Sequence, residues 1–246
     1  MRIFIQNKLY KFLYIKYKMI KNIKIFGERN SGTNFLSQLI TKNISGINLC
    51  NHHYKCKTGW KHGFPKLNRF KNLNQTLFVF IIRDLESWVK SMYNNPYSYK
   101  RPTNINRFIT KTLPINDHRK DHDVNINKAE KQNVIKLRYA KIKHYKMFFE
   151  RVPNAIFINL KDLQENNNKF LQFLKKTYSL NVSNNICKIL SHTKNSNIKN
   201  KNRSYNTVLP PINNKDVEIE QMVNNLKTEY CYKSNLIQEC KELTQI

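Results

Sequence analysis

Two apolar runs, each followed by a polar turn and an amphipathic segment, dominate the first half of the chain. Ile23–Phe26 is β-branched and aromatic and predicts a buried strand, and the apolar positions of 35–40 have the spacing of a helix. Leu77–Ile82 is a run of six apolar residues, which is typical of a parallel strand buried on both faces. A helix is expected after it, at 85–93. The pattern therefore predicts two successive strand–loop–helix units.

The second half of the chain continues this alternation. We expect the following elements: an irregular insertion at 94–127, a helix at 128–151, a buried strand at 155–159, a helix at 170–178, a basic loop at 195–206 and a helix at 216–230. Alternating strands and helices predict an α/β fold, a three-layer sandwich with a central, mostly parallel sheet. Residues 1–20 are expected to be an N-terminal extension and 21–246 a single domain.

Composition narrows the class of protein further. Apolar residues make up 40% and aromatic residues 12% of the 246, which argues against intrinsic disorder. A formal net charge of +28 favours anionic partners, among them nucleotides and acidic membrane surfaces. The basic residues are spread over the chain, as an A+T-rich genome would produce, and a nucleic-acid partner is therefore not favoured. Five cysteines without disulfide-like spacing, and no uninterrupted apolar stretch that could span a bilayer, indicate a cytoplasmic protein; the oligomeric state is not indicated.

The turn after the first strand, Gly27–Thr33, has the features of a phosphate-binding loop. It joins a strand to a helix, where backbone N–H groups and the helix dipole can hold a phosphate. Gly27 and Gly32 bracket four residues as in a Walker A loop, but Thr33 stands where an NTPase carries its lysine, so ATP or GTP hydrolysis is disfavoured. The candidate nucleotide-binding residues here are Gly27, Arg29, Asn30, Ser31, Gly32, Thr33 and Asn34.

A second candidate phosphate site follows the strand 77–82. Arg83 comes directly after that strand, at the predicted carboxyl edge of the sheet, where open α/β folds bind ligands. Ser91 follows eight residues later in the next helix, so a guanidinium and a hydroxyl can hold one phosphate together. Lys201 and Arg203, in the basic loop, are further candidates for the nucleotide phosphates; an unordered linker is the alternative interpretation of that loop.

Together these motifs resemble those of sulfotransferases. Ser31–Thr33 is similar to the 5′-phosphosulfate loop of that family, although Asn30 separates Arg29 from it, and Arg83 with Ser91 is similar to its 3′-phosphate motif. The resemblance implies a P-loop-like fold, 3′-phosphoadenylyl sulfate as the sulfuryl donor and no metal requirement.

Two other segments extend the resemblance. Trp60–Pro65 resembles the segment in which cytosolic sulfotransferases carry a catalytic histidine near a lysine, and 156–163 resembles a strand of the family that ends in a Tyr-Glu-Asp-Leu-type element. The resemblance implies that His62 is the general base, since histidine titrates near neutrality. Lys61 and Arg29 are then the candidates that neutralise charge on the transferred group. The alternative for His62 is a loop histidine without a catalytic role.

The sequence also holds two groups of metal-ligating residue types. Cys50, His52, His53 and Cys56 lie close together but lack a standard zinc spacing, and the mixed charges of Asp117–Asp123 are typical of a solvated loop. We therefore expect no metal site.

Two other classes of function fit parts of the sequence. A P-loop kinase or other nucleotide-binding protein with a divergent loop would explain 27–33, but such a protein needs the lysine that Thr33 replaces. A non-catalytic protein that binds polyanions would explain the charge; its binding should fall steeply with salt and survive the loss of Arg83. The acceptor of a sulfotransferase, a hydroxyl or an amine, is not indicated by the sequence.

Overall fold

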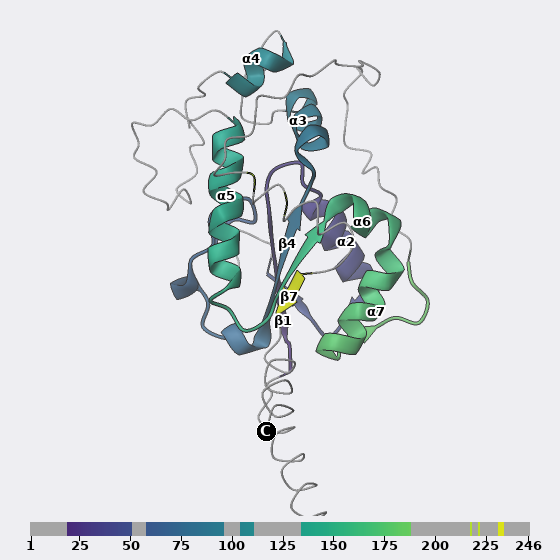
Figure 1. Ribbon diagram of the computed structural model, residues 1–246. Coiled ribbons are helices and arrows are strands. Elements are labelled where there is room, and N and C mark those ends of the chain that lie inside the picture. The colour runs from purple at the N-terminus through teal and green to yellow at the C-terminus, as the bar shows by residue number, and fades with distance from the viewer. Residues whose placement is uncertain are drawn as a thin grey trace, which may run out of the picture.

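Figure 1 shows a computed structural model in which one sheet stands between two groups of helices. The structure describes residues 19–50, 58–95, 104–110 and 134–187, together with Val217, Gln221 and the backbone of 231–233. Several predictions therefore lie outside the described residues: 1–18 of the expected extension, 96–103 and 111–127 of the expected insertion, 128–133 of the next helix, the basic loop 195–206, and the helix 216–230 apart from Val217 and Gln221, which are helical.

The central sheet has the order β3-β1-β4-β5-β7. Its strands are β1 (Asn22–Gly27), β3 (Asn48–Leu49), β4 (Thr76–Ile82), β5 (Ala155–Asn159) and β7 (Cys231–Lys233). β3, β1, β4 and β5 are parallel, and β7 pairs antiparallel with β5. The predicted α/β fold with a mostly parallel sheet is confirmed.

Aromatic side chains on one face of this sheet stack from strand to strand. Phe26, Phe80 and Phe157 are register neighbours on β1, β4 and β5, and their ring centroids are 5.8 and 4.9 Å apart in succession. All seven residues of β4 are buried, because both of its faces are covered by helices. Burying each such side chain contributes about 1.5–3 kcal/mol to folding, and this apolar sheet is the support for the loops at its carboxyl edge.

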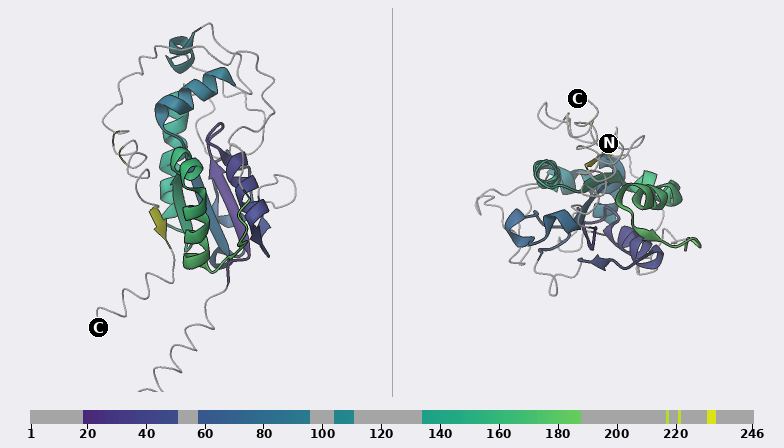
Figure 2. Two further views of the ribbon diagram at one scale, coloured as in Figure 1. Left: turned by 90° about the vertical axis from the view of Figure 1, so that its right-hand side faces the viewer. Right: turned by 90° about the horizontal axis from the view of Figure 1, so that it is seen from below.

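Helices cover both faces of the sheet, as the views in Figure 2 show. On the aromatic face lie α3 (Leu85–Asn94), α4 (Ile105–Thr110) and α5 (Val134–Phe149). On the other face lie α2 (Thr33–Asn43), α6 (Leu160–Glu165) and α7 (Asn167–Tyr178). Among the described residues, no helix combines the length and the apolar character needed to cross a membrane.

The structure differs from the sequence-based expectations in two places. Part of the insertion expected to be irregular forms the helix α4, because Ile105, Phe108 and Ile109 have helical spacing and bury against α3 and α5. The helix α6 was not expected; it begins directly after β5, where the Asn159 side chain accepts a hydrogen bond from the N–H of Lys161. Short elements complete the fold: β2 (Ile44–Ser45), β6 (Asn181–Val182), and the 3₁₀ turns Leu67–Arg69 and Leu73–Gln75.

Candidate functional site

The loop that follows β1 lies beside the end of β4, at the carboxyl edge of the parallel sheet. A Cβ atom at Gly27 would stand 2.6 Å from the carbonyl oxygen of Ile81, so only glycine allows the two strands to approach this closely. Gly32 has φ +93°, and a Cβ there would stand 2.3 Å from a methyl carbon of Leu160. The two glycines that resemble a phosphate-binding loop are therefore required by the local packing.

The loop ends at the N-terminus of α2, where backbone N–H groups are unpaired within the helix. No side chain caps this helix, and the first intrahelical bond is donated by the N–H of Leu36 to the carbonyl of Gly32. The N–H groups before Leu36 in the first turn have no acceptor within the helix itself. Ser31 turns inward, and its hydroxyl donates to the carbonyl of Glu28 at 2.7 Å. The N-terminus of α2 therefore presents backbone N–H groups at the end of the loop, and phosphate binding there stays a prediction.

Asn30 connects the two predicted phosphate motifs. Its side-chain amide donates to the backbone carbonyls of Ser91, at 3.3 Å, and Asn95, at 3.0 Å, near the end of α3. Its own carbonyl accepts a hydrogen bond from Nη1 of Arg83 at 3.3 Å. Asn30 has φ +60°, a backbone conformation that asparagine tolerates better than most residues. The residue that interrupts the resemblance is thus the one that brings the two motifs together.

Arg83 stands at the end of β4, oriented by the start of α3. Its Nε donates to the hydroxyl of Ser87 at 2.9 Å, and Asp84 caps α3 by accepting from the N–H of Ser87 at 2.9 Å. Burial lowers the pKa of Arg83, while the Asp84 carboxylate opposes this effect. Ser91 is placed on the same helix, and its contact with the loop is through its carbonyl.

Arg29 is packed between the only two tryptophans of the sequence. Its guanidinium carbon lies 4.7 Å from the ring centroid of Trp60, and its carbonyl accepts a hydrogen bond from the indole N–H of Trp88 at 2.9 Å. The Arg29 residue is 7% exposed. Its predicted role in neutralising charge stays a prediction, but the structure places its guanidinium against an aromatic ring.

His62 and Lys61 lie against the end of β1. The N–H of Gly27 donates to the carbonyl of Lys61 at 3.0 Å, and Nδ1 of His62 is 2.8 Å from the carbonyl oxygen of Gly27. Because a carbonyl only accepts, Nδ1 carries the proton and the lone pair of the neutral ring is on Nε2. Burial lowers the pKa of His62 to about 3; the bond to Gly27 opposes this, and the charges of Lys61, Lys141 and Arg29 lower it further.

Lys61 reaches from this segment to the first turn of α2. Its ammonium donates to the side-chain oxygen of Asn34, an exposed residue next to Thr33. Burial lowers the pKa of Lys61. A cation therefore stands where the unpaired N–H groups of α2 begin, which is a suitable arrangement for an anionic ligand.

Sequence reasoning missed the contribution of α5. Arg138 of this helix forms a buried ion pair with Glu28, at 2.9 Å, and donates to the carbonyl of Arg83 at 3.0 Å. Tyr145 donates to the carbonyl of Gly63 at 3.2 Å, and Nε2 of His144 donates to the carbonyl of Pro65 at 2.7 Å. The sequence did carry one signal of this contribution. Arg138 and Lys141 are cations at positions where an amphipathic helix turns toward the core.

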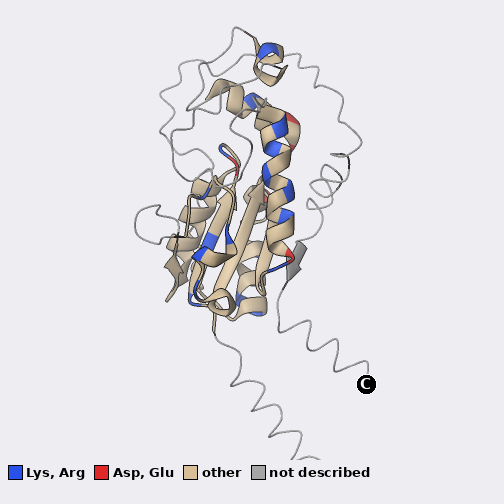
Figure 3. Cartoon of the chain, turned by 90° about the vertical axis from the view of Figure 1, so that its left-hand side faces the viewer, with Lys and Arg blue, Asp and Glu red and all other residues tan. Residues whose placement is uncertain are grey.

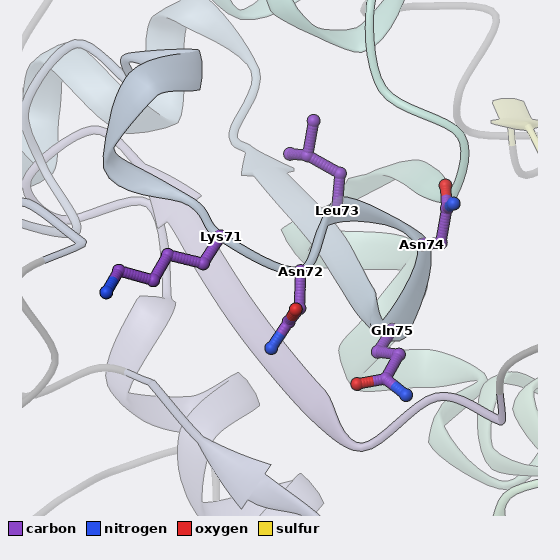
Figure 4. Close-up of a pocket in the computed structure, with 5 residues that line it drawn as sticks. All are labelled: Lys71, Asn72, Leu73, Asn74 and Gln75. Atoms are coloured by element: carbon purple, nitrogen blue, oxygen red, sulfur yellow. The ribbon is translucent and has the colours of Figure 1, made fainter.

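Several of the residues that the sequence suggested for phosphate or metal binding fall in segments that the structure does not describe. Lys201, Arg203, His52, His53, Cys56 and Asp117–Asp123 lie outside the described residues. Within the described part of the chain, no group of three or more His, Cys, Asp or Glu side chains is placed to hold a metal ion. A surface hollow of about 280 Å³, lined by residues 71–75 (Figure 4), lies at the turn before β4, at the opposite edge of the sheet from Arg83.

Comparison with protein-family models, with curated proteins and with solved structures finds no match to this chain.

Proposed function

We propose that this protein is a sulfotransferase that moves a sulfuryl group from 3′-phosphoadenylyl sulfate to an acceptor hydroxyl. The observation that carries the proposal is the contact between the two motifs, in which Arg83 donates to the carbonyl of Asn30. This contact brings the N-terminus of α2 and the strand-end guanidinium to one site. A nucleotide with a phosphate at each end of its ribose offers one anion to each of them.

The residues beside the loop supply what the reaction needs. The acceptor oxygen forms a new bond to sulfur while the bond from sulfur to the bridging phosphate oxygen breaks, and that oxygen leaves with the electron pair as part of 3′-phosphoadenosine 5′-phosphate. The acceptor proton goes to Nε2 of His62, the ring nitrogen that carries the lone pair. Lys61, next to the start of α2, neutralises charge that develops on the leaving oxygen.

The electrostatic surroundings of His62 suit a base that works only with the donor present. Burial and three neighbouring cations disfavour the imidazolium, and the pKa of His62 is about 3. The phosphates and the sulfuryl group of the donor are anionic, so their arrival opposes those cations and makes Nε2 more basic. His62 then gains basicity when the reacting group is bound.

Nucleotide selectivity tests the proposal directly. The two tryptophans of the sequence both contact Arg29, so their fluorescence reports on the occupancy of the loop. We expect 3′-phosphoadenosine 5′-phosphate to bind far more tightly than AMP, which lacks the 3′-phosphate, and more tightly than ATP. Equal affinity for the first two nucleotides would contradict the role of Arg83, and preference for ATP would favour a nucleotide-binding protein of another class.

A further inference from the structure

Asn30 contacts both ends of the helix α3. At the end of the helix, its Nδ2 donates to the carbonyls of Ser91, at 3.3 Å, and Asn95, at 3.0 Å. Before the start of the helix, its own backbone carbonyl accepts a hydrogen bond from Nη1 of Arg83 at 3.3 Å. One residue of the 27–33 loop is therefore bonded to the last turn of α3 and to the arginine that precedes its first turn.

The side-chain amide of Asn30 acts as a cap for the C-terminus of α3. The last carbonyls of a helix have no partner within the helix, and donors from elsewhere in the protein can satisfy them. α3 ends at Asn94, so the carbonyls of Ser91 and Asn95 lie at this end. The last turn of α3, all of which is described, carries no basic side chain; Figure 3 marks the basic positions in blue. Asn30 therefore supplies a donor to this helix end from another segment of the chain.

The guanidinium of Arg83 is held from two sides. Its Nε donates to the hydroxyl of Ser87 at 2.9 Å, and its Nη1 donates to the carbonyl of Asn30. Because a guanidinium is planar, two such bonds fix the direction of the whole group, including the N–H groups that would face a phosphate. A side chain that is oriented before binding loses less freedom when the ligand arrives. The place of the Asn30 carbonyl thus determines how well Arg83 is oriented for an anion.

We propose that Asn30 is a positioning residue that sets the preference for a nucleotide with a 3′-phosphate. Its amide holds the end of α3, its carbonyl orients Arg83, and Arg83 binds the 3′-phosphate. This inference rests on the proposed function, in which that phosphate belongs to the sulfuryl donor. It differs from the role expected from the sequence, because the Asn30 side chain acts on the protein and not on the nucleotide.

The variant Asn30→Gly tests this role, because glycine allows the positive φ of +60° and keeps the backbone carbonyl but has no amide. Asn166→Gly is the matched control. Asn166 is also half-buried, and its amide donates to Asp162 at the junction of α6 and α7. Thermal unfolding shows that each variant folds. Calorimetry then measures the dissociation constants of 3′-phosphoadenosine 5′-phosphate and of AMP, and their ratio gives the preference for the 3′-phosphate.

We expect Asn30→Gly to lower this preference roughly tenfold, the effect of about one lost hydrogen bond, and to change the affinity for AMP by less than about twofold. Asn166→Gly should keep the preference of the unaltered protein. Asn30→Asp, which also tolerates positive φ but has no side-chain N–H group, should lower the preference as well. In the double variant Asn30→Gly with Arg83→Ala, the preference should stay within about twofold of that in Arg83→Ala alone, because Asn30 acts through Arg83.

An unchanged preference in the Asn30 variants would overturn the inference. An equal loss of affinity for both nucleotides would also overturn it, because the Asn30 amide would then act on the 27–33 loop alone. A further loss in the double variant would show that Asn30 acts independently of Arg83. If the unaltered protein shows no preference for the 3′-phosphate, the proposed function fails and the inference fails with it. A preference that the unaltered protein shows and Asn30→Gly keeps rejects only the role of Asn30.

Discussion

Nδ1 of His62 donates a hydrogen bond to the carbonyl oxygen of Gly27, the last residue of β1, at 2.8 Å. The bond fixes the tautomer of the imidazole and holds the ring at the end of β1, beside the start of the 27–33 loop. Nδ1 therefore holds the ring in place, while Nε2 carries the lone pair. A substitution can keep the first function and remove the second.

Replacing His62 with asparagine should greatly reduce turnover and preserve nucleotide binding. An asparagine amide can take the place of Nδ1–H and donate to Gly27, but it offers no basic nitrogen. We expect the affinity for 3′-phosphoadenosine 5′-phosphate to stay within about twofold, and turnover of labelled donor, measured with a panel of acceptors, to fall by about 10²–10⁴-fold. Full turnover of His62→Asn would exclude it as the base and leave Lys61 as the candidate.

The lowered pKa of His62 should make folding stability depend on pH. Its pKa is about 3 in the folded protein and about 6.5 in the unfolded chain, so between these values the unfolded state binds the additional proton. His62 therefore lowers the free energy of unfolding as pH falls from about 6.5 toward 3, by at most about 1.4 kcal/mol per pH unit, and has no such effect above that window.

Urea denaturation of the unaltered protein and of His62→Asn at pH 7 and pH 4 measures this contribution. The variant should lose less stability than the unaltered protein on acidification, since it has no imidazole to protonate. Parallel losses in the two proteins would show that the His62 pKa is close to its ordinary value.

Arg83→Ala should weaken binding of the doubly phosphorylated nucleotide. In the proposed site, the substitution would remove a charge-assisted hydrogen bond to the 3′-phosphate, which contributes about 1.5–3 kcal/mol, or a loss of roughly 10- to 150-fold in affinity. The affinity for AMP should change little. Arg151→Ala is the matched control, because Arg151 is an exposed arginine just before β5, at the opposite edge of the sheet. Similar losses of affinity for both nucleotides in Arg83→Ala would place Arg83 away from the 3′-phosphate.

Gly32→Ala should destabilise the fold more than Gly46→Ala. Both glycines have positive φ, +93° and +72°, so each substitution meets a backbone penalty of about 1–2 kcal/mol. At Gly46 a Cβ would meet nothing within 4 Å, whereas at Gly32 it would meet a methyl carbon of Leu160 at 2.3 Å, which adds about 1–3 kcal/mol. Chemical denaturation of the two variants measures the difference, and equal free energies of unfolding would mean that Leu160 moves aside without cost.

The pattern of apolar residues correctly predicted those strands and helices that depend mainly on the local sequence. β4 follows from six consecutive apolar residues, and β5 and the helices after β1 and β4 follow from spacing within single segments. Arg83 at the end of a buried parallel strand could be placed at the carboxyl edge in advance, because parallel strands end together. The helix α4 was missed because six residues are too short for periodicity to stand out within a polar region.

Only the tertiary structure decided where the charged side chains of the site lie. Arg29 stacks on Trp60, Arg138 reaches Glu28 from a helix 110 residues away in sequence, and Asn30 bridges the loop to α3. A long cationic side chain can extend in many directions at similar cost, and its position depends on which distant rings, carboxylates and carbonyls the fold brings near it. The periodicity of the sequence determines which faces are buried; the contacts between elements determine what each charge meets there.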